Sequence, residues 1–305
     1  MDKTIIVIVG PTAVGKTSLA IRLAQHFDTD VLSADSRQFY KEMSLGTAKP
    51  TVDEMKGVRH HFIDSLSILQ TYTAGDFERD ALTLLDHLFK KRDVVVVAGG
   101  SGMYVKALCE GLDDMPEHNE NLRVILNAEA ERDYDVVVSR LKELDPIYYS
   151  QVDLSNKQRV VRALEVCIGT GGRFSDYRSA EKRQRPFKII KIGLERDRAH
   201  LYQAIDDRMD MMLDKGLLEE AKSLFAFKHT YALQTIGYSE IYSFLNGEYD
   251  WNECVRVLKR NSRRYAKKQL TWFKKDPEVR WFDVEAPCFF ESVMQKVQYT
   301  LLKST

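Results

Sequence analysis

Apolar residues follow two periodicities along the chain, and each predicts a different kind of element. The segments Ile5 to Val9 and Val94 to Ala98 are apolar at consecutive positions, and a similar signal returns at Phe187 to Leu194. Uninterrupted apolar runs are typical of parallel strands that helices cover on both faces. A shorter apolar strand, Val31 to Ala34, follows the first helical segment, Ser18 to His26. The pattern predicts an α/β protein with a parallel sheet flanked by helices.

Helical sequence dominates the middle of the chain. From about Glu117 the residues are charged and β-branched runs are few, with helical segments at Leu122 to Leu144 and at Asn156 to Ile168. Because the strand signal returns only after this stretch, we expect a helical insertion domain between two strands of the sheet. The expected division is a first core part at residues 1–114, the insertion at 115–184 and a second core part at 185–305. An insertion of this size beside a ligand site suits a clamp or lid.

The carboxyl-terminal part is mostly helical, with helices expected at 198–215, 217–227, 239–245 and 251–273. Basic residues recur on the last helix at spacings of three and four, and no acidic residue occurs between Cys254 and Lys275; they are Arg256, Lys259, Arg260, Arg263, Arg264, Lys267 and Lys268. This spacing stacks charge along one broad side of a helix. A solvated helix face is one explanation. The lack of compensating acids favours a nucleic-acid backbone as partner.

A phosphate-binding motif stands directly behind the first strand. Gly10-Pro11-Thr12-Ala13-Val14-Gly15-Lys16-Thr17 fits the P-loop spacing G-x-x-x-x-G-K-[ST]. In such a loop backbone N–H groups surround an anion at the start of a helix, Lys16 reaches the terminal phosphates and the Thr17 hydroxyl holds Mg²⁺. The alternative is a glycine-containing turn without a ligand. The order of strand, turn and helix favours the phosphate site.

Two further polar segments follow strand ends. Asp35 comes directly after the strand at 31–34, and Ser101 lies in the glycine-rich segment after the strand at 94–98. Ligands of parallel sheets lie beyond the carboxyl ends of the strands, so the P-loop, Asp35 and Ser101 are predicted to converge on one crevice. Asp35 is either a general base that accepts a proton from an amine or hydroxyl, or a metal or water partner or helix cap. Its position at the predicted crevice favours the general-base role.

The amino-acid composition indicates the class of protein that carries this site. The chain has 305 residues, 44% hydrophobic and 30% charged, with a formal net charge of zero. It is therefore globular, and any basic face must be balanced elsewhere. Four scattered cysteines form no zinc-binding pattern, and no apolar run reaches membrane-spanning length or resembles a leader. We expect a soluble cytoplasmic protein without a structural metal and without an obligate protein partner, acting as a monomer.

The P-loop alone would suggest a nucleotide-binding, ATP-binding protein, but two hydrolase classes fit poorly. A motor or switch ATPase needs an apolar strand that ends in a metal-anchoring Asp, whereas the strand at 94–98 runs into Gly99-Gly100. A GTPase needs N-K-x-D, whereas Asn156-Lys157 continues as Gln158-Arg159. Neither nucleotide-hydrolysing class matches.

The ordered set of motifs resembles one family, the tRNA dimethylallyltransferases, also called isopentenyl-tRNA transferases. The similarity runs nearly from end to end. Besides the P-loop it includes Asp35-Ser36-Arg37-Gln38, Gly46-Thr47-Ala48-Lys49-Pro50, His60-His61-Phe62-Ile63-Asp64, Gly99-Gly100-Ser101-Gly102, Gly111-Leu112-Asp113-Asp114, Gln158 to Glu165, Gln234-Thr235-Ile236-Gly237-Tyr238 and Arg263 to Gln269. Ser101 stands where the family usually has Thr, and the hydroxyl is kept. The zinc finger of some eukaryotic relatives is absent.

The resemblance implies a specific reaction. The P-loop would bind the diphosphate of dimethylallyl diphosphate, and a five-carbon unit would pass to the exocyclic N6 of adenosine 37 in tRNAs that read codons beginning with U. The insertion would grip the anticodon stem-loop, and the target base would be turned out of its stack. Mg²⁺ is the implied cofactor; whether ATP can also enter the P-loop is left open.

The resemblance also implies residue roles. Asp35 would take the proton of the attacking amine, while Lys16, the P-loop amides, Mg²⁺ on Thr17 and Arg208 would stabilise the departing diphosphate. Ser101 would contact the RNA near the reacting base. Further tRNA contacts are expected at Asp35, Ser36, Arg37, Gln38, Arg123, Gln158, Arg159, Val160, Val161, Arg162, Arg263 and Lys267.

Two other hypotheses account for part of the pattern. A P-loop small-molecule or nucleoside kinase would use Asp35 to deprotonate a hydroxyl and the insertion as a lid. A non-catalytic RNA-binding protein with this fold would bind RNA regardless of Asp35. ATP turnover with a small acceptor would identify the first, and RNA affinity without any product would identify the second.

Overall fold

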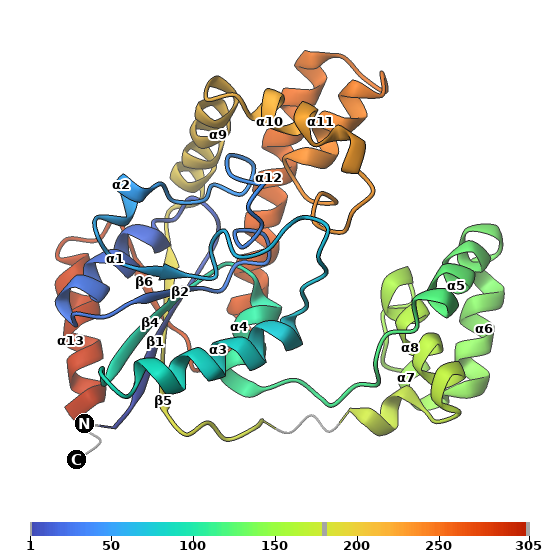
Figure 1. The fold of residues 1–305 in the computed structure, drawn as a ribbon, viewed down its shortest axis with the longest axis horizontal. Helices are drawn as coiled ribbons and strands as arrows, with labels where there is room; N and C mark the ends of the chain where they lie inside the picture. The colour runs from blue at the N-terminus through green and yellow to red at the C-terminus, as the bar shows by residue number, and fades with distance from the viewer. Residues whose placement is uncertain (1, 179–181, 303–305) are drawn as a thin grey trace. The chain divides into compact units, whose positions relative to one another are not determined.

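The computed structural model describes residues 2–178 and 182–302, so residues 179–181 of the expected insertion lie outside the described part. Six parallel strands form one sheet in the order β3-β2-β4-β1-β5-β6 (Figure 1). The strands are β1 (Thr4–Val9), β2 (Val31–Ser33), β3 (His60–His61), β4 (Val94–Ala98), β5 (Lys188–Glu195) and β6 (Arg280–Asp283). The predicted α/β architecture with a parallel sheet is confirmed.

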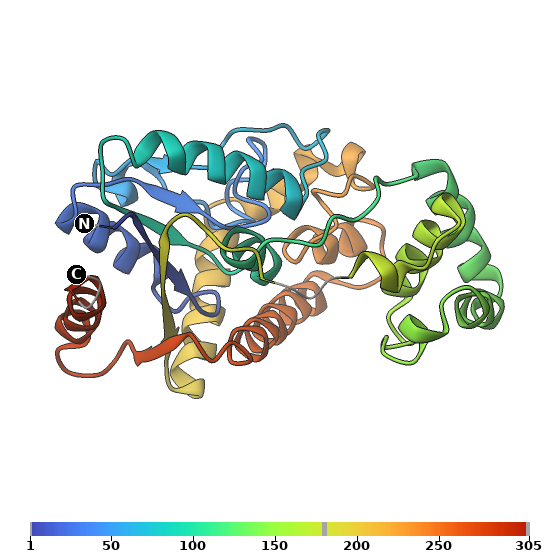
Figure 2. The same ribbon diagram turned by 90° about the horizontal axis from the view of Figure 1, so that it is seen from below.

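Consecutive apolar residues in the central strands serve both faces of the sheet. In β1, Ile5 and Val7 belong to one hydrophobic cluster, whereas Ile6 and Ile8 belong to another. The first cluster includes side chains of α3 (Ala74–Leu88) and α4 (Gly102–Glu110), and the second those of α1 (Lys16–His26) and α13 (Phe289–Leu302). Figure 2 shows helices on both sides of the strands. Since each face has its own core, the continuous apolar pattern is explained.

Between β5 and β6 the chain forms four α-helices: α9 (Arg198–Asp214), α10 (Leu217–Ser223), α11 (Tyr238–Leu245) and α12 (Trp251–Phe273). They lie where the periodicity predicted them, except that the helix expected at 217–227 ends at Ser223 and continues as a short 3-10 turn, Phe225–Phe227. The short helix α2 (Val52–Met55) and the edge strands β3 and β6 had no sequence prediction. Two to four residues are too few to establish a periodicity.

Residues Gly111–Arg183 form a second compact unit, separate from the unit made by residues 1–110 and 184–305. Its helices are α5 (Glu120–Arg132), α6 (Tyr134–Leu144), α7 (Pro146–Tyr149) and α8 (Lys157–Thr170), followed by a 3-10 turn at Phe174–Tyr177. Leu126, Val137, Leu141 and Leu164 are buried in a core of its own. Asn156 caps α8 by accepting a hydrogen bond from the Arg159 amide at 3.2 Å. Among the described residues, no helix is long and apolar enough to cross a membrane.

Candidate active site

The P-loop connects β1 to α1, and its glycines are required by the backbone geometry. Gly10 has φ +147°, and a Cβ atom there would lie 2.7 Å from the carbonyl oxygen of Leu194. Gly15 is the N-cap of α1 in a left-handed conformation with φ 101°. Only glycine adopts both arrangements without strain. The loop therefore brings the amide groups that begin α1 to the carboxyl end of β1, where an anion is favoured.

Lys16 folds back over this loop. Its Nζ donates to the carbonyl oxygens of Gly10 at 3.0 Å and Pro11 at 2.7 Å. Burial lowers the pKa of Lys16 to about 7; the nearby charge of Arg208 also lowers it, and Asp35 opposes both. A lysine held at this pKa gains charge when an anionic ligand arrives, because the ligand offsets the cost of burial.

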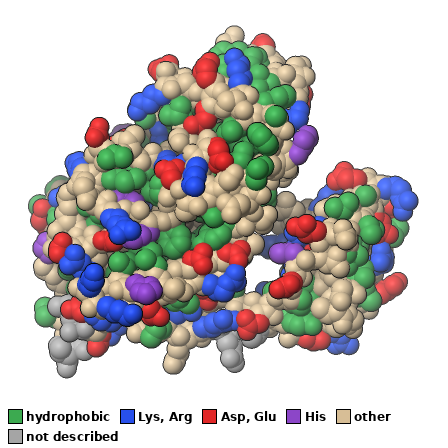
Figure 3. Space-filling model, viewed as in Figure 1, with side chains coloured by type: hydrophobic (Ala, Val, Ile, Leu, Met, Phe, Trp, Pro, Cys, Tyr) green, Lys and Arg blue, Asp and Glu red, His purple; other side chains and the backbone are tan. Residues whose placement is uncertain are grey.

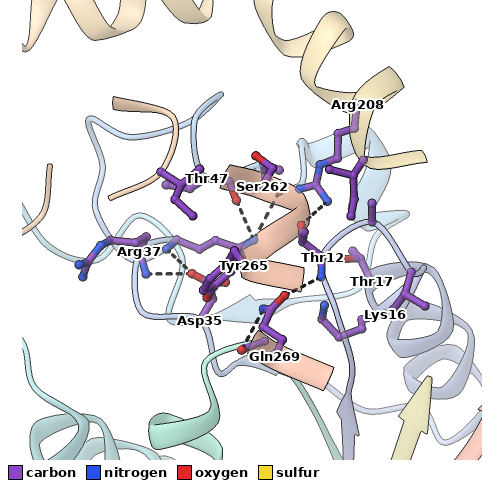
Figure 4. Close-up of a pocket in the computed structure, with 18 of the residues that line it drawn as sticks. Thr12, Lys16, Thr17, Asp35, Arg37, Thr47, Arg208, Ser262, Tyr265 and Gln269 are labelled. Atoms are coloured by element: carbon purple, nitrogen blue, oxygen red, sulfur yellow. Dashed lines mark hydrogen bonds between the residues drawn. The ribbon is translucent and has the colours of Figure 1, made fainter. Parts of the chain in front are cut away.

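A cavity of about 570 Å³ opens beside the P-loop. The segments that line it come from β2, the loop at 46–48, the end of β4, α9, the turn at 235–236 and α12. Of the predicted residues, those on its wall are Thr12, Ala13, Val14, Gly15, Lys16, Thr17, Asp35, Ser36, Arg37, Gln38 and Arg208. The structure thus brings the P-loop, the Asp35 segment and the arginine of α9 to one cavity (Figure 4).

Asp35 combines two of the roles weighed from the sequence. Its Oδ1 accepts the amide of Arg37 at 2.9 Å and that of Gln38 at 3.3 Å, which is the geometry of a turn cap. Within the described residues, Oδ2 receives no hydrogen bond. One carboxylate oxygen therefore fixes the turn, and the other is available to a proton donor in the cavity.

Ser101 lies behind this turn and does not line the cavity. Only 8% of the residue is exposed. Its Oγ accepts the Ser36 amide at 2.8 Å and donates to the Ser36 hydroxyl at 3.1 Å. The hydroxyl that was expected to contact RNA is engaged in holding the segment beside Asp35.

Arg208 reaches the P-loop from α9. Its Nη1 donates to the Thr12 hydroxyl at 3.3 Å. Burial lowers the pKa of the guanidinium, and Asp35 opposes this shift. Because a guanidinium remains charged at any working pH, it offers permanent positive charge opposite Lys16.

Three residues of α12 that were not among the predicted site residues line the cavity: Ser262, Tyr265 and Gln269. Gln269 joins two loops, since its Oε1 accepts the Thr12 amide at 2.8 Å and its Nε2 donates to the Gly100 carbonyl at 3.0 Å. Desolvation of the hydroxyl in the cavity raises the pKa of Tyr265 to about 12, although 37% of the residue is exposed, so the hydroxyl keeps its proton. Ser262 and Gln269 are buried polar residues in the stripe that contains Cys254, Leu258, Ala266 and Phe273. A polar residue within the buried, otherwise apolar stripe of a helix is the sequence signal that could have identified Ser262 and Gln269.

The basic side of α12 is partly neutralised by α9. Arg263 donates to both oxygens of Asp206 at 2.6 Å, and Lys259 pairs with Asp210 at 2.6 Å. Both acids lie on another helix, and the sequence pattern of α12 alone does not predict this pairing. Lys267 is exposed and has no carboxylate partner among the residues described. Figure 3 likewise shows basic and acidic side chains interspersed on one face of the molecule.

In the separate unit, Glu165 organises two of the predicted RNA contacts. This carboxylate, 2% exposed, accepts hydrogen bonds from Arg162 Nη1 at 2.6 Å and from Arg123 Nε at 3.0 Å. Gln158 and Arg159 are exposed on α8. Val160 and Val161 are 0% and 3% exposed and belong to the core of this unit, so their side chains pack inside it and are not available to RNA.

The P-loop offers one side chain that is suitable as a ligand for a divalent cation. The Thr17 hydroxyl lies at the cavity near the start of α1 and makes no hydrogen bond within the described part of the chain. A hydroxyl beside bound phosphate oxygens fits Mg²⁺, which keeps several waters and takes few protein ligands. The carboxylate group Glu110, Asp276 and Glu278 is a poorer candidate, because Lys191 Nζ lies 2.6 Å from Asp276 and 2.8 Å from Glu278 and already supplies their cation.

Comparison with protein families gives a match to the IPP transferase family over residues 38–276. The chain is 52% identical over 301 residues to the tRNA dimethylallyltransferase of Cytophaga hutchinsonii, covering 97% of this chain and 99% of that one. It is 49% identical over 286 residues to the tRNA dimethylallyltransferase of Christiangramia forsetii, covering 93% and 95% of the two chains.

Solved structures agree with these sequence matches. The full-length tRNA isopentenylpyrophosphate transferase of Bacillus halodurans is 35% identical, with a TM-score of 0.73 and coverage of 99% of this chain and 97% of that one. A eukaryotic dimethylallyltransferase, solved acting on tRNA, is 27% identical, with a TM-score of 0.78 over 92% of this chain and 74% of that one.

Proposed function

The chain belongs to the IPP transferase family, and on this premise we propose that it transfers the dimethylallyl group of dimethylallyl diphosphate to N6 of adenosine 37 in tRNA. Relatives at about half identity over nearly the whole chain bear the name of this activity, which favours the transferase over a small-molecule kinase. The observation that carries the proposal is the meeting of the P-loop, Asp35 and Arg208 at one cavity.

The chemistry joins the two substrates in a single displacement. The N6 lone pair attacks C1 of the dimethylallyl group, the bond from C1 to the diphosphate oxygen breaks, and the diphosphate leaves with the electron pair. The nitrogen then loses a proton, for which Asp35 Oδ2 is the acceptor. Thr17 would hold a Mg²⁺ ion that neutralises charge on the diphosphate.

Charge on the leaving diphosphate is met by groups that are already in position. Arg208 is held at the P-loop by its hydrogen bond to the Thr12 hydroxyl, and Lys16 Nζ is held over the same loop by the carbonyl oxygens of Gly10 and Pro11. Donors fixed before the reaction lower the barrier more than donors that must reorganise. Arg37 and Gln38 follow Asp35 on the cavity wall and are proposed to contact the flipped nucleotide.

The remaining assignments extend this proposal. Arg123, Arg159 and Arg162 of the insertion, with Arg263 and Lys267 of α12, would contact the RNA backbone of the anticodon stem-loop. The tRNAs concerned would read codons beginning with U, and the protein would act as a monomer in the cytoplasm.

The test is direct. Purified protein is incubated with Mg²⁺, dimethylallyl diphosphate and unmodified tRNA, and the digested RNA is searched by mass spectrometry for prenylated adenosine. We expect the product with the wild-type protein, and its formation to be slower by about 10²- to 10⁴-fold with Asp35→Asn. ATP turnover on a small acceptor, without any prenylated adenosine, would establish a kinase in its place.

A further inference from the structure

A carboxylate outside the cavity holds one part of its rim. Glu220, on α10, accepts the amides of three consecutive residues: Ser44 at 3.1 Å, Leu45 at 2.8 Å and Gly46 at 3.0 Å. It also accepts the hydroxyl of Tyr238 at 2.6 Å. Successive amides that converge on one anion form a strong and directional binding arrangement. Within the described residues Glu220 pairs with no lysine or arginine, so the three amides of the loop and the Tyr238 hydroxyl stabilise its negative charge.

The loop held in this way forms part of the cavity wall. Gly46, Thr47 and Ala48 line the cavity, whereas Glu220 does not. On the other side of the loop, Gln38 Nε2 donates to the carbonyl of Thr47 at 3.3 Å and to that of Ala48 at 3.4 Å. The loop is therefore tied on one side to α10 and on the other to the segment that follows Asp35.

Tyr238 extends the contact to a second part of the rim. A Cβ atom on Gly46 would lie 2.4 Å from the Tyr238 ring, so the two segments pack as closely as glycine permits. Gly237, with φ +102°, allows the sharp turn that precedes α11. Thr235 and Ile236, just before this turn, also line the cavity. Glu220 and Tyr238 thus join the segments 46–48 and 235–236.

We propose that Glu220 is a positioning residue for the acceptor nucleotide, an inference that rests on the proposed function. It lies outside the cavity and acts through the loop at 46–48, whose carbonyl oxygens accept the hydrogen bonds of Gln38 Nε2, while Gln38 Oε1 accepts a hydrogen bond from the Ser33 hydroxyl at 2.9 Å. The donor diphosphate belongs to the P-loop, whose positions are fixed by Gln269 and Arg208 and not by Glu220. A substitution of Glu220 should therefore raise KM for tRNA and leave the affinity for dimethylallyl diphosphate nearly unchanged.

The test compares KM for tRNA with the dissociation constant of dimethylallyl diphosphate. Glu220→Gln replaces one acceptor oxygen with an NH₂ group that faces backbone N–H groups. We expect KM for tRNA to rise about tenfold, as for loss of a charge-assisted hydrogen bond, with diphosphate affinity within about twofold. Tyr238→Phe removes one of the four donors and should give a smaller rise, about threefold. If Glu220→Gln does not fold, Tyr238→Phe decides the outcome.

Glu42→Gln is the matched control. The Glu42 carboxylate also anchors a loop, accepting hydrogen bonds from the Ile68 amide at 3.1 Å and the Ser67 hydroxyl at 2.7 Å, but Ser67 and Ile68, unlike the residues at 46–48, do not line the cavity. The proposal is overturned if Glu220→Gln changes diphosphate affinity and tRNA KM alike, leaves both unchanged, or behaves as Glu42→Gln does. A wild-type protein that yields no prenylated adenosine would instead refute the proposed function.

Discussion

At the scale of single residues, Asp35 carries the sharpest chemical assignment. Its two oxygens differ, since Oδ1 caps the turn at Arg37 and Gln38 while Oδ2 is the proposed proton acceptor. Asp35→Asn keeps an oxygen for the turn and removes the base. We expect single-turnover rates to fall by about 10²- to 10⁴-fold while tRNA affinity stays within about twofold.

Rapid-quench assays and filter binding measure the two quantities. Asp35→Ala is the comparison, because it loses the turn as well and should also weaken tRNA binding. A near-normal rate for Asp35→Asn would remove the general-base role.

Lys16 predicts a proton linkage in donor binding. Its pKa of about 7 in the free protein means that the side chain is mostly neutral at pH 8 and mostly charged at pH 6. A bound diphosphate favours the ammonium and raises this pKa, so binding at pH 8 takes up a proton. Uptake by this group should disappear toward pH 6, where the proton is already present.

Titration calorimetry in buffers of different ionisation enthalpy measures the uptake. We expect between half a proton and one proton per site at pH 8. Lys16→Arg is the matched control, since a guanidinium is charged throughout. Equal uptake by the wild type and Lys16→Arg would assign the proton to another group.

At the scale of elements, α12 supports two loops of the cavity wall, the P-loop and the segment after β4, through the side chain of Gln269. Gln269→Ala would leave the Thr12 amide and the Gly100 carbonyl without partners, which costs about 1–3 kcal/mol when such groups are buried. We expect weaker dimethylallyl diphosphate binding, by roughly tenfold, because the loop that receives the diphosphate loses its support. Thr271→Ala, an exposed position on the same helix, should have no effect.

Fluorescence titration with the diphosphate distinguishes the two variants. Gln269→Glu adds a second comparison, because it can accept from Thr12 but cannot donate to Gly100. Unchanged affinity in Gln269→Ala would show that the P-loop holds its conformation without α12.

The same helix separates two kinds of basic residue. Arg263 is committed to Asp206, whereas Lys267 is exposed without a carboxylate partner in the described part of the structure. We expect Lys267→Ala to reduce the salt dependence of tRNA binding by about one unit of slope, since one phosphate contact is lost. Arg263→Ala should reduce it less and lower stability more. A larger slope change for Arg263→Ala would mean that its ion pair opens to bind RNA.

The elements themselves were largely predictable, and the reason is physical. Long strands buried on both faces leave an uninterrupted apolar run in the sequence, and helices of two turns or more leave a helical periodicity, as β1 and α12 show. Pairings between elements impose none. The bond from Gln269 to Thr12 joins residues 257 positions apart, and the ion pair of Arg263 with Asp206 crosses between two helices. Such contacts depend on tertiary packing, so the sequence could indicate the cavity but not these supports.

At the scale of the whole molecule, the two compact units have separate cores. Leu164 is fully buried in the unit at 111–183, and Leu23 is fully buried in the unit that holds the sheet. All three tryptophans, Trp251, Trp272 and Trp281, belong to the unit that holds the sheet. Tryptophan fluorescence therefore reports on the sheet unit alone, while hydrogen exchange in α5, α6 and α8 reports on the other.

This separation predicts that damage to one core stays local. Leu164→Ala should lower the free energy of unfolding of the insertion by about 2–5 kcal/mol. Hydrogen exchange in α5, α6 and α8 should therefore be faster by at least about 30-fold, the factor that corresponds to about 2 kcal/mol. The denaturation midpoint from tryptophan fluorescence and the affinity for diphosphate should not change, whereas tRNA modification should fall with the integrity of the insertion. Leu23→Ala should give the reverse pattern. If Leu164→Ala shifts the fluorescence midpoint as well, the units unfold as one, and the insertion then contributes to the stability of the site itself.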